Sequence, residues 1–221
     1  MRREQNGMKR LLGSTVITSG LLAFSSLSNA ALILSAGSAP SLLPIAGNDF
    51  NTNMQVLGYS EMITGSQINV DQAGSVTFTY IAAESGFTNS FNLTTGSMTE
   101  ANEAFNFNGY NSLTINVTAG EILNFNFTSA GVNALSPVDN FSDANPRGAN
   151  LQGLGIFTDG SNSPHQQVIL GYDDQWKFPD DDNHDDMMIR VDFNPVPVPA
   201  AVWLFGSGLI GLVGVARRKK A

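Results

Sequence analysis

Apolar and polar residues alternate in several short segments in the middle of the chain. In the clearest segment, Ser75 to Ile81, the apolar side chains include Val76, Phe78 and Tyr80. Alternation with a period of two places such side chains on one face of a β-strand and the polar ones on the other. The pattern also predicts strands at Leu113–Val117, Ile122–Phe127, Gln167–Tyr172 and Met187–Phe193, and a short apolar strand within the loop 148–160.

The segments between these strands are rich in Gly and Asn, and none of them predicts a long helix. Thr118-Ala119-Gly120-Glu121 separates two of the predicted strands and has the length of a hairpin loop. Lys, Arg and Glu, which favour helices, are scarce. The pattern therefore predicts an all-β fold, an antiparallel β-sandwich of the jelly-roll kind, over residues 31–194.

The first residues of the chain have the pattern of a secretory signal. Lys9 and Arg10 precede an apolar run, and Ser28 and Ala30 follow it where a signal peptidase requires small side chains. The run is interrupted by Gly, Ser and Thr, so it lacks the amphipathic period of a core helix. We therefore predict a signal peptide at residues 1–30.

A second apolar segment lies near the C-terminus. Residues 200–216 carry no charge, and their number is at the short end of what spans a bilayer. Trp203 lies near the outer edge of this segment, and four basic residues follow it at 217–220. Positive charges stay on the cytoplasmic side of a membrane, so a transmembrane helix here would leave the preceding domain outside.

Alternating prolines, in the sequence NPVPVPAA, join the domain to this span as an extended connector. The whole segment VPVPAAVWLFGSGLIGLVGVARRKK resembles the PEP-CTERM family of protein-sorting tails, with Val198 where the family's motif has Glu, as in a VPxPA-type variant. The resemblance implies a Gram-negative bacterium and cleavage of the tail at 195–221 by an exosortase. It also implies transient anchoring in the inner membrane and a link to exopolysaccharide or biofilm.

Charge is unevenly distributed along the chain. Between the two basic ends, Arg147, Lys177 and Arg190 stand against eighteen Asp and Glu, a net charge of −15. A surface of this sign repels phosphate backbones, so we expect no nucleic-acid partner. The chain has no cysteine, which excludes disulfides, thiolate zinc sites and a cysteine nucleophile.

The acidic residues are most concentrated between two predicted strands, in the sequence GYDDQWKFPDDDNHDDMMIRVDF. Eight aspartates fall between Asp173 and Asp192. Calcium binds roughly six to eight oxygen ligands, and the carboxylates of Asp-rich loops can supply them. We therefore predict a calcium site in the loop 173–186; the alternative is a solvated acidic turn that keeps a sheet edge soluble.

The same segment resembles an acidic motif of bacterial surface and PEP-CTERM proteins: an acidic pair, a variable turn, then Asp-x-Asp-aromatic-Asn-Asp before a strand. His184 occupies the aromatic position, and we expect it to be a turn or supporting residue rather than a ligand. The resemblance implies a metal-binding set of Asp173, Asp174, Asp181, Asn183, Asp185 and Asp186.

No catalytic constellation is evident, and we expect the protein not to be an enzyme. The two histidines, His165 and His184, are not part of an H-E-x-x-H helix, and no G-x-S-x-G elbow is present. Aromatic residues offer an alternative, a sugar-stacking face beside the calcium loop, although core packing is favoured for the phenylalanines. The residues concerned are Phe87, Phe91, Tyr110, Tyr172 and Trp176.

The sequence thus predicts an exported, surface- or matrix-associated structural or binding protein, stabilised by Ca²⁺ and processed by a signal peptidase and an exosortase. Exopolysaccharide is the expected partner outside the cell. A calcium-dependent carbohydrate-binding module and, less favoured, a secreted hydrolase are the alternatives.

Overall fold

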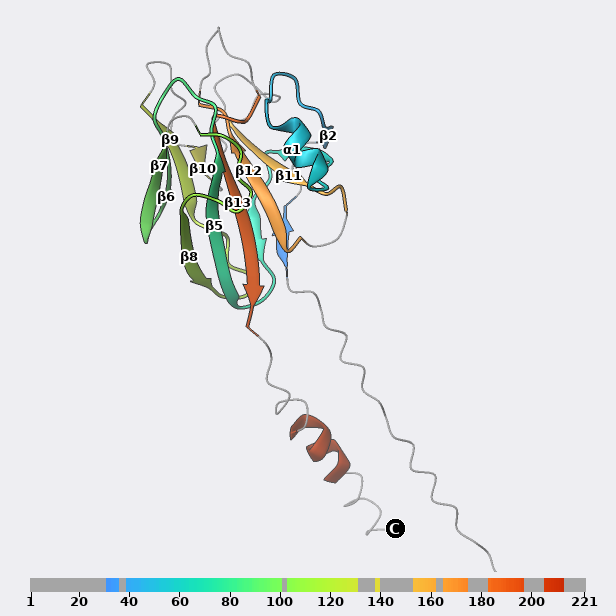
Figure 1. Ribbon diagram of the computed structural model, residues 1–221. Coiled ribbons are helices and arrows are strands. Elements are labelled where there is room, and N and C mark those ends of the chain that lie inside the picture. Colours follow the sequence, from blue (N-terminus) through green and yellow to red (C-terminus); the bar gives the residue numbers. More distant parts are fainter. Residues whose placement is uncertain are drawn as a thin grey trace, which may run out of the picture.

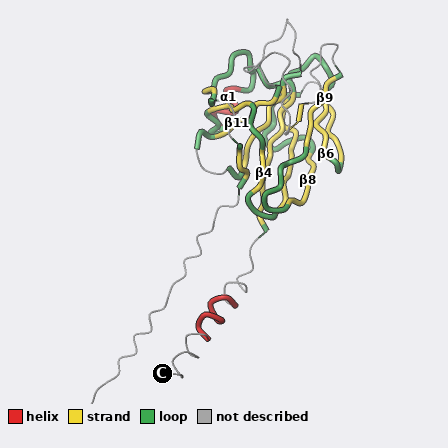
Figure 2. The backbone as a smooth tube through the Cα atoms, turned by 180° about the vertical axis from the view of Figure 1, so that it is seen from behind, coloured by secondary structure: helices red, strands yellow, loops and turns green. Residues whose placement is uncertain are grey.

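The structure is a computed structural model that describes residues 31–35, 39–100, 103–130, 138–139, 153–161, 165–174, 183–196 and 205–212. Over these ranges the chain is mostly antiparallel β-sheet, which confirms the predicted all-β class (Figures 1 and 2). The predicted signal peptide at residues 1–30 lies outside the described ranges, as does much of the predicted tail.

The larger sheet has seven strands in the order β2-β3-β11-β12-β13-β5-β8, with every neighbouring pair antiparallel. Its longest strands, β5 and β13, lie side by side. The bounds are β2 (Ser41–Leu42), β3 (Glu61–Thr64), β5 (Gly74–Ala82), β8 (Ser112–Val117), β11 (Leu154–Thr158), β12 (Gln167–Tyr172) and β13 (Met187–Pro195).

The smaller sheet has four strands in the order β10-β9-β6-β7, and a separate pair of strands joins β1 to β4. These pairs are antiparallel as well. The bounds are β6 (Asn89–Leu93), β7 (Gly96–Glu100), β9 (Phe125–Ser129), β10 (Val138–Asp139), β1 (Leu32–Leu34) and β4 (Ile68–Val70).

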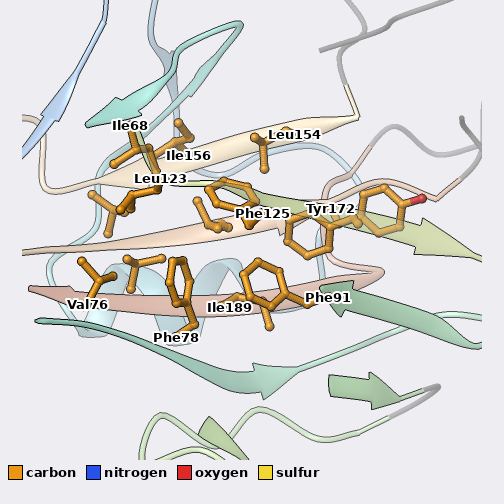
Figure 3. Packing of buried hydrophobic residues seen from close by; sticks show 14 of the residues in the cluster. Ile68, Val76, Phe78, Phe91, Leu123, Phe125, Leu154, Ile156, Tyr172 and Ile189 are labelled. Atoms are coloured by element: carbon orange, nitrogen blue, oxygen red, sulfur yellow. The ribbon is translucent and has the colours of Figure 1, made fainter. Parts of the chain in front are cut away.

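The two sheets face one another across a core rich in phenylalanine (Figure 3). Phe91 of β6 is fully buried, with its ring centroid 5.1 Å from that of Phe78 on β5 and 5.1 Å from that of Phe127 on β9. Burying an aromatic ring of this size contributes about 3–5 kcal/mol relative to alanine. The contact between inward-facing positions of both sheets is therefore a large part of what holds the sandwich together.

A second apolar cluster covers the opposite face of the larger sheet. Helix α1 (Asn51–Val56) contributes Met54, which packs with Phe157 of β11 and Ile169 of β12. Figure 1 shows α1 on the side of the sandwich where β11 and β12 lie. Both faces of these two strands are buried, so their sequences are apolar throughout rather than alternating.

One connection predicted from the sequence is wrong. The segment 118–121 does not close a hairpin, because β8 pairs with β5 in the larger sheet whereas β9 pairs with β6 and β10 in the smaller one. Between the two strands the chain runs beside β4, where Leu123 N–H donates to the Ile68 carbonyl at 3.0 Å. A turn signal in the sequence specifies that the chain reverses, but not which sheet the next strand joins.

The end of the domain differs slightly from the prediction. Pro195 is the last residue of β13 and lies opposite Gly74, so the strand extends into the proline connector. Proline is tolerated at such a strand end, because its lack of an N–H does not break a row of backbone hydrogen bonds between the strands. Beyond it, residues 205–212 form a helix with Phe205 and Ile210 exposed. Among the described residues, no helix has both the length and the apolar character needed to cross a membrane.

Candidate cation site at the junction of the two sheets

The acidic segment connects two strands that are direct neighbours, as the sequence predicts. Tyr172, the last residue of β12, lies opposite Met187, the first residue of β13. The residues that follow β12 and those that precede β13 therefore meet at one edge of the larger sheet. Asp181 and the rest of 175–182 lie outside the described residues.

Three of the four described acids of this segment are buried, and Asp186 is half-buried. The exposed fraction is 1% for Asp173 and 0% for both Asp174 and Asp185. Burying a charged carboxylate without a partner is strongly unfavourable. Arg190 is the only Lys or Arg in the described part of the chain, and it pairs with Asp192 at 2.8 Å. The alternative of a solvated acidic turn therefore does not fit these three side chains.

One part of the segment faces the smaller sheet. Asp174 Oδ2 accepts hydrogen bonds from Ser85 Oγ at 2.6 Å and from Asn89 Nδ2, at the start of β6, at 2.8 Å. Asp186 Oδ2 accepts from the main-chain N–H of Asp174 at 2.7 Å, and its carbonyl oxygen accepts from Asn89 Nδ2 at 3.1 Å. We call Ser85, Asn89, Asp174 and Asp186 the junction cluster, because they join the two sheets.

Several oxygen atoms at the junction cluster are buried and have no hydrogen-bond partner among the described residues. They are Asp174 Oδ1, Asn89 Oδ1 and the Tyr172 hydroxyl. Burial and, after it, the negative charge of Asp174 raise the pKa of Asp186 to about 9. Burial and the same two carboxylates raise the pKa of Tyr172. The cluster thus concentrates negative charge and unpaired oxygen, which a proton or a hard cation can neutralise.

The other part of the segment is attached to the loop that precedes α1. Asp185 Oδ2 accepts from the main-chain N–H of Asp49 at 2.8 Å, and the Asn183 carbonyl accepts from Asn48 Nδ2 at 2.9 Å. The Asp185 carbonyl accepts from the Glu84 N–H at 2.9 Å. We call Asn48, Asp49, Asn183 and Asp185 the anchor cluster, because these bonds fix the path of the turn.

His184, which lies between Asn183 and Asp185 in the chain, has a positive φ of 60°. It is 3% exposed and lies over Gly155 and Gly171, which are directly opposite one another on β11 and β12. A Cβ added to Gly155 would lie 3.1 Å from His184 Cδ2, and one added to Gly171 would collide with the His184 carbonyl oxygen. The two glycines therefore make room for His184, in agreement with its predicted role as a turn residue.

The structure separates the predicted metal-binding set into groups. Asp174 and Asp186 lie in the junction cluster, whereas Asn183 and Asp185 lie in the anchor cluster. The N–H of Asp173 donates to the Gly153 carbonyl at 3.0 Å. Within the described ranges, no three His, Asp or Glu side chains are placed so that they could hold a metal ion.

Sequence reasoning missed Ser85 and Asn89 as parts of this site. Ser85 lies in the segment between β5 and β6, and Asn89 is the first residue of β6; both are about 90 residues before the acidic run. This segment crosses from the larger sheet to the smaller one, which brings it over the ends of β12 and β13. The polar run Glu84-Ser85-Gly86 at the end of an apolar strand is a turn signal, but nothing in it indicates a distant acidic partner.

The aromatic residues considered for a sugar-stacking face do not share a surface. Phe91 and Tyr172 are buried in the core between the sheets. Tyr110 is 42% exposed and packs against Tyr80, with its hydroxyl donating to the Ala104 carbonyl at 2.6 Å. Phe87 is partly buried, and Trp176 lies outside the described residues. Core packing of Phe91, favoured from the sequence, is what the structure has.

A separate polar pocket of about 280 Å³ lies beside Tyr59. On its wall, His165 Nδ1 is 3.5 Å from Asp159 Oδ1, and hydrogen bonds from Ser161 lower the pKa of Asp159. The acid lies between the serine and the histidine, so these residues do not have the order of a hydrolytic triad, in which the histidine contacts the serine.

Comparisons of the chain with models of protein families, with curated proteins and with solved structures found no match.

Proposed function

We propose that this chain is an exported, surface- or matrix-associated protein whose β-sandwich is stabilised by a calcium ion at the acidic segment. One observation carries the calcium proposal: Asp174 is fully buried beside Asp186, and the only described Lys or Arg pairs elsewhere. Buried carboxylates of this kind are stable when a cation or a proton neutralises them. A calcium ion, which prefers carboxylate and carbonyl oxygens, suits both the charge and the donor atoms.

The export proposal is supported by the two ends of the sequence. The basic, apolar and small-residue stretches of 1–30 have the order of a signal peptide, and 195–221 has the order of a PEP-CTERM-type sorting tail. In this proposal the precursor has a signal helix and a transmembrane helix on either side of a jelly-roll-like sandwich. An exosortase removes the tail, and the non-enzymatic mature domain acts at the cell surface or in exopolysaccharide.

Calorimetry tests the calcium proposal. We expect titration of calcium into the metal-free full chain, kept in mild detergent, to release or absorb heat with a saturable isotherm. Because the ion binds the folded state, the melting temperature should rise with calcium and fall with chelator. An absence of binding heat at millimolar calcium, together with an unchanged melting temperature, would end this part of the proposal.

Intact mass of the protein released by the native host tests the export proposal. The mature chain is expected to lack both the first 30 residues and the terminal sequence ARRKKA. Deletion of 217–221 should prevent export and processing of the precursor, because the basic end sets the orientation of the transmembrane helix. Recovery of the full 221-residue chain from the cytosol would contradict export.

A calcium-dependent carbohydrate-binding module is the second candidate, and the polar pocket favours it. Tyr59, Asp159, His165 and Gln167 line that pocket, and such groups bind hydroxyl-rich ligands. Saturable binding of host exopolysaccharide, reduced by Asp159→Asn and by chelator, would support this function. Binding that survives both treatments would exclude it.

A further inference from the structure

We infer that the cation binds between the two sheets, with Asn89 of β6 as a ligand beside Asp174 and Asp186, so that it clips the smaller sheet to the larger one. This inference rests on the proposed calcium function and specifies where the ion lies. It differs from the sequence prediction, which places every ligand within the segment 173–186.

The side chain of Asn89 is directed into the junction cluster. It is 0% exposed, and its Nδ2 donates both to Asp174 Oδ2 at 2.8 Å and to the Asp186 carbonyl at 3.1 Å. Its Oδ1 is buried and has no partner among the described residues. Buried polar atoms are nearly always hydrogen-bonded, so an amide oxygen left without a partner indicates a missing ligand.

Two further buried oxygens near this position have no described partner. Asp174 Oδ1 belongs to the carboxylate that Asn89 contacts. The hydroxyl of Tyr172, two residues before Asp174, is also buried without a described partner, and Figure 3 shows it pointing out of the apolar cluster. Unpartnered oxygens from the first residue of β6, from the last residue of β12 and from the second residue after β12 therefore belong to one part of the fold.

The donor types match a hard cation. Two carboxylates with an amide oxygen, completed by water, form a set that calcium accepts, whereas soft metals prefer sulfur and nitrogen. Rotation of the Asn89 amide exchanges the positions of Oδ1 and Nδ2, so the oxygen can be turned toward the ion, whereas the nitrogen, which is only a donor, cannot bind it.

The anchor cluster positions the turn and does not bind the cation. Asp185 Oδ2 and the Asn183 carbonyl are occupied by donors from the loop before α1. These bonds hold the turn that carries Asp186, so Asn183 and Asp185 are positioning residues in this arrangement. Asn89 belongs to the smaller sheet, whereas Asp174 follows β12 of the larger sheet, so cation binding must strengthen the contact between β6 and the ends of β12 and β13.

Calcium titration of the full chain and two matched variants tests this inference. Asn89→Ala should weaken calcium binding at least ~10-fold, equivalent to the loss of about 1.4 kcal/mol. Asn92→Ala is the control on the same strand: Asn92 contacts Asn126 Oδ1 at 3.1 Å and Thr128 Oγ1 at 3.3 Å, away from the junction cluster. Its calcium affinity should stay within about twofold of the wild type.

The outcomes separate the inference from the proposed function. If the wild-type chain binds no calcium, the calcium function itself fails. If the wild type binds and Asn89→Ala binds equally well, calcium lies elsewhere and the clip between sheets is wrong. Should Asn89→Ala fail to fold, Asn89→Asp decides, because it keeps an oxygen at the same place: calcium binding at least as tight as in the wild type supports the inference, and a tenfold loss overturns it.

Discussion

The junction cluster and the anchor cluster are both built mainly from Asp and Asn, and they share a turn in which Asp185 and Asp186 are adjacent, yet their surroundings differ. In the anchor cluster, the carboxylate of Asp185 receives a main-chain N–H from Asp49. In the junction cluster, burial and then the charge of Asp174 raise the pKa of Asp186 to about 9. The number of acids in a segment therefore says little about their state, because each carboxylate responds to the donors and charges next to it.

The difference also concerns which parts of the fold each cluster joins. The anchor cluster attaches the turn to the loop before α1, on the outer side of the larger sheet. The junction cluster attaches the same turn to β6, across the core. Changes in the two clusters should consequently have separable effects on stability and on cation binding.

The largest effect should come from pH in the absence of calcium. The Asp186 carboxyl keeps its proton in the folded chain up to about pH 9, whereas its ordinary value is 3.8. Between these values the folded state binds more protons than the unfolded state, so stability must fall as pH rises, by at most about 1.4 kcal/mol per pH unit. Urea unfolding in chelator from pH 5 to 8 measures this slope.

Two controls sharpen the pH experiment. Asp186→Asn carries no titratable group at that position, so the slope should become much shallower. Saturating calcium competes with the proton, so the apparent calcium affinity should rise with pH. A metal-free stability that is independent of pH in this range would show that Asp186 is not perturbed.

The next largest effect should distinguish the two clusters by calcium affinity. Asp174→Asn removes a buried charge from the junction cluster and should weaken calcium binding by about 100-fold, or about 2.7 kcal/mol. Asp185→Asn keeps an oxygen that can accept the Asp49 N–H, so its affinity should stay within about threefold of the wild type. Equal losses in the two variants would mean that the clusters act as one site.

Substitution of the glycines beneath His184 should cost somewhat less. In Gly171→Ala the new Cβ would collide with the His184 carbonyl and lie 2.6 Å from Phe157 Cε2. Such overpacking costs about 1–3 kcal/mol, which chemical denaturation can measure. Gly86→Ala is the control, since a Cβ there meets nothing within 4 Å. A Gly171→Ala variant as stable as the wild type would show that the turn relocates easily.

The smallest effect should follow from truncating one amide side chain of the anchor cluster. Asn48→Ala loses the donor to the Asn183 carbonyl and the acceptor for the Phe50 N–H. It should destabilise the fold by about 1–2 kcal/mol, with calcium affinity unchanged within about threefold. Asn53→Ala, at an exposed position of α1, should change stability by less than about 0.5 kcal/mol. A marked loss of calcium binding in Asn48→Ala would contradict the separation of the two clusters.

Much of the fold could be predicted from the sequence because local patterns carry it. The alternation at Ser75–Ile81 and the apolar run at Gln167–Tyr172 each correspond to a strand of the larger sheet, and the acidic segment does connect neighbouring strands. The hairpin at 118–121 was predicted wrongly, since alternation identifies a strand without its partner.

The sequence by itself determined the strand-forming periods, the acidic charge of the domain and the presence of oxygen donors next to β12 and β13. Only the tertiary structure decided which of those donors meet. Asn89 is far from Asp174 in the chain. Their contact at 2.8 Å exists because the segment between β5 and β6 passes from the larger sheet to the smaller one near the end of β12. Burial, which sets the state of each carboxylate, likewise depends on residues that are distant in the sequence.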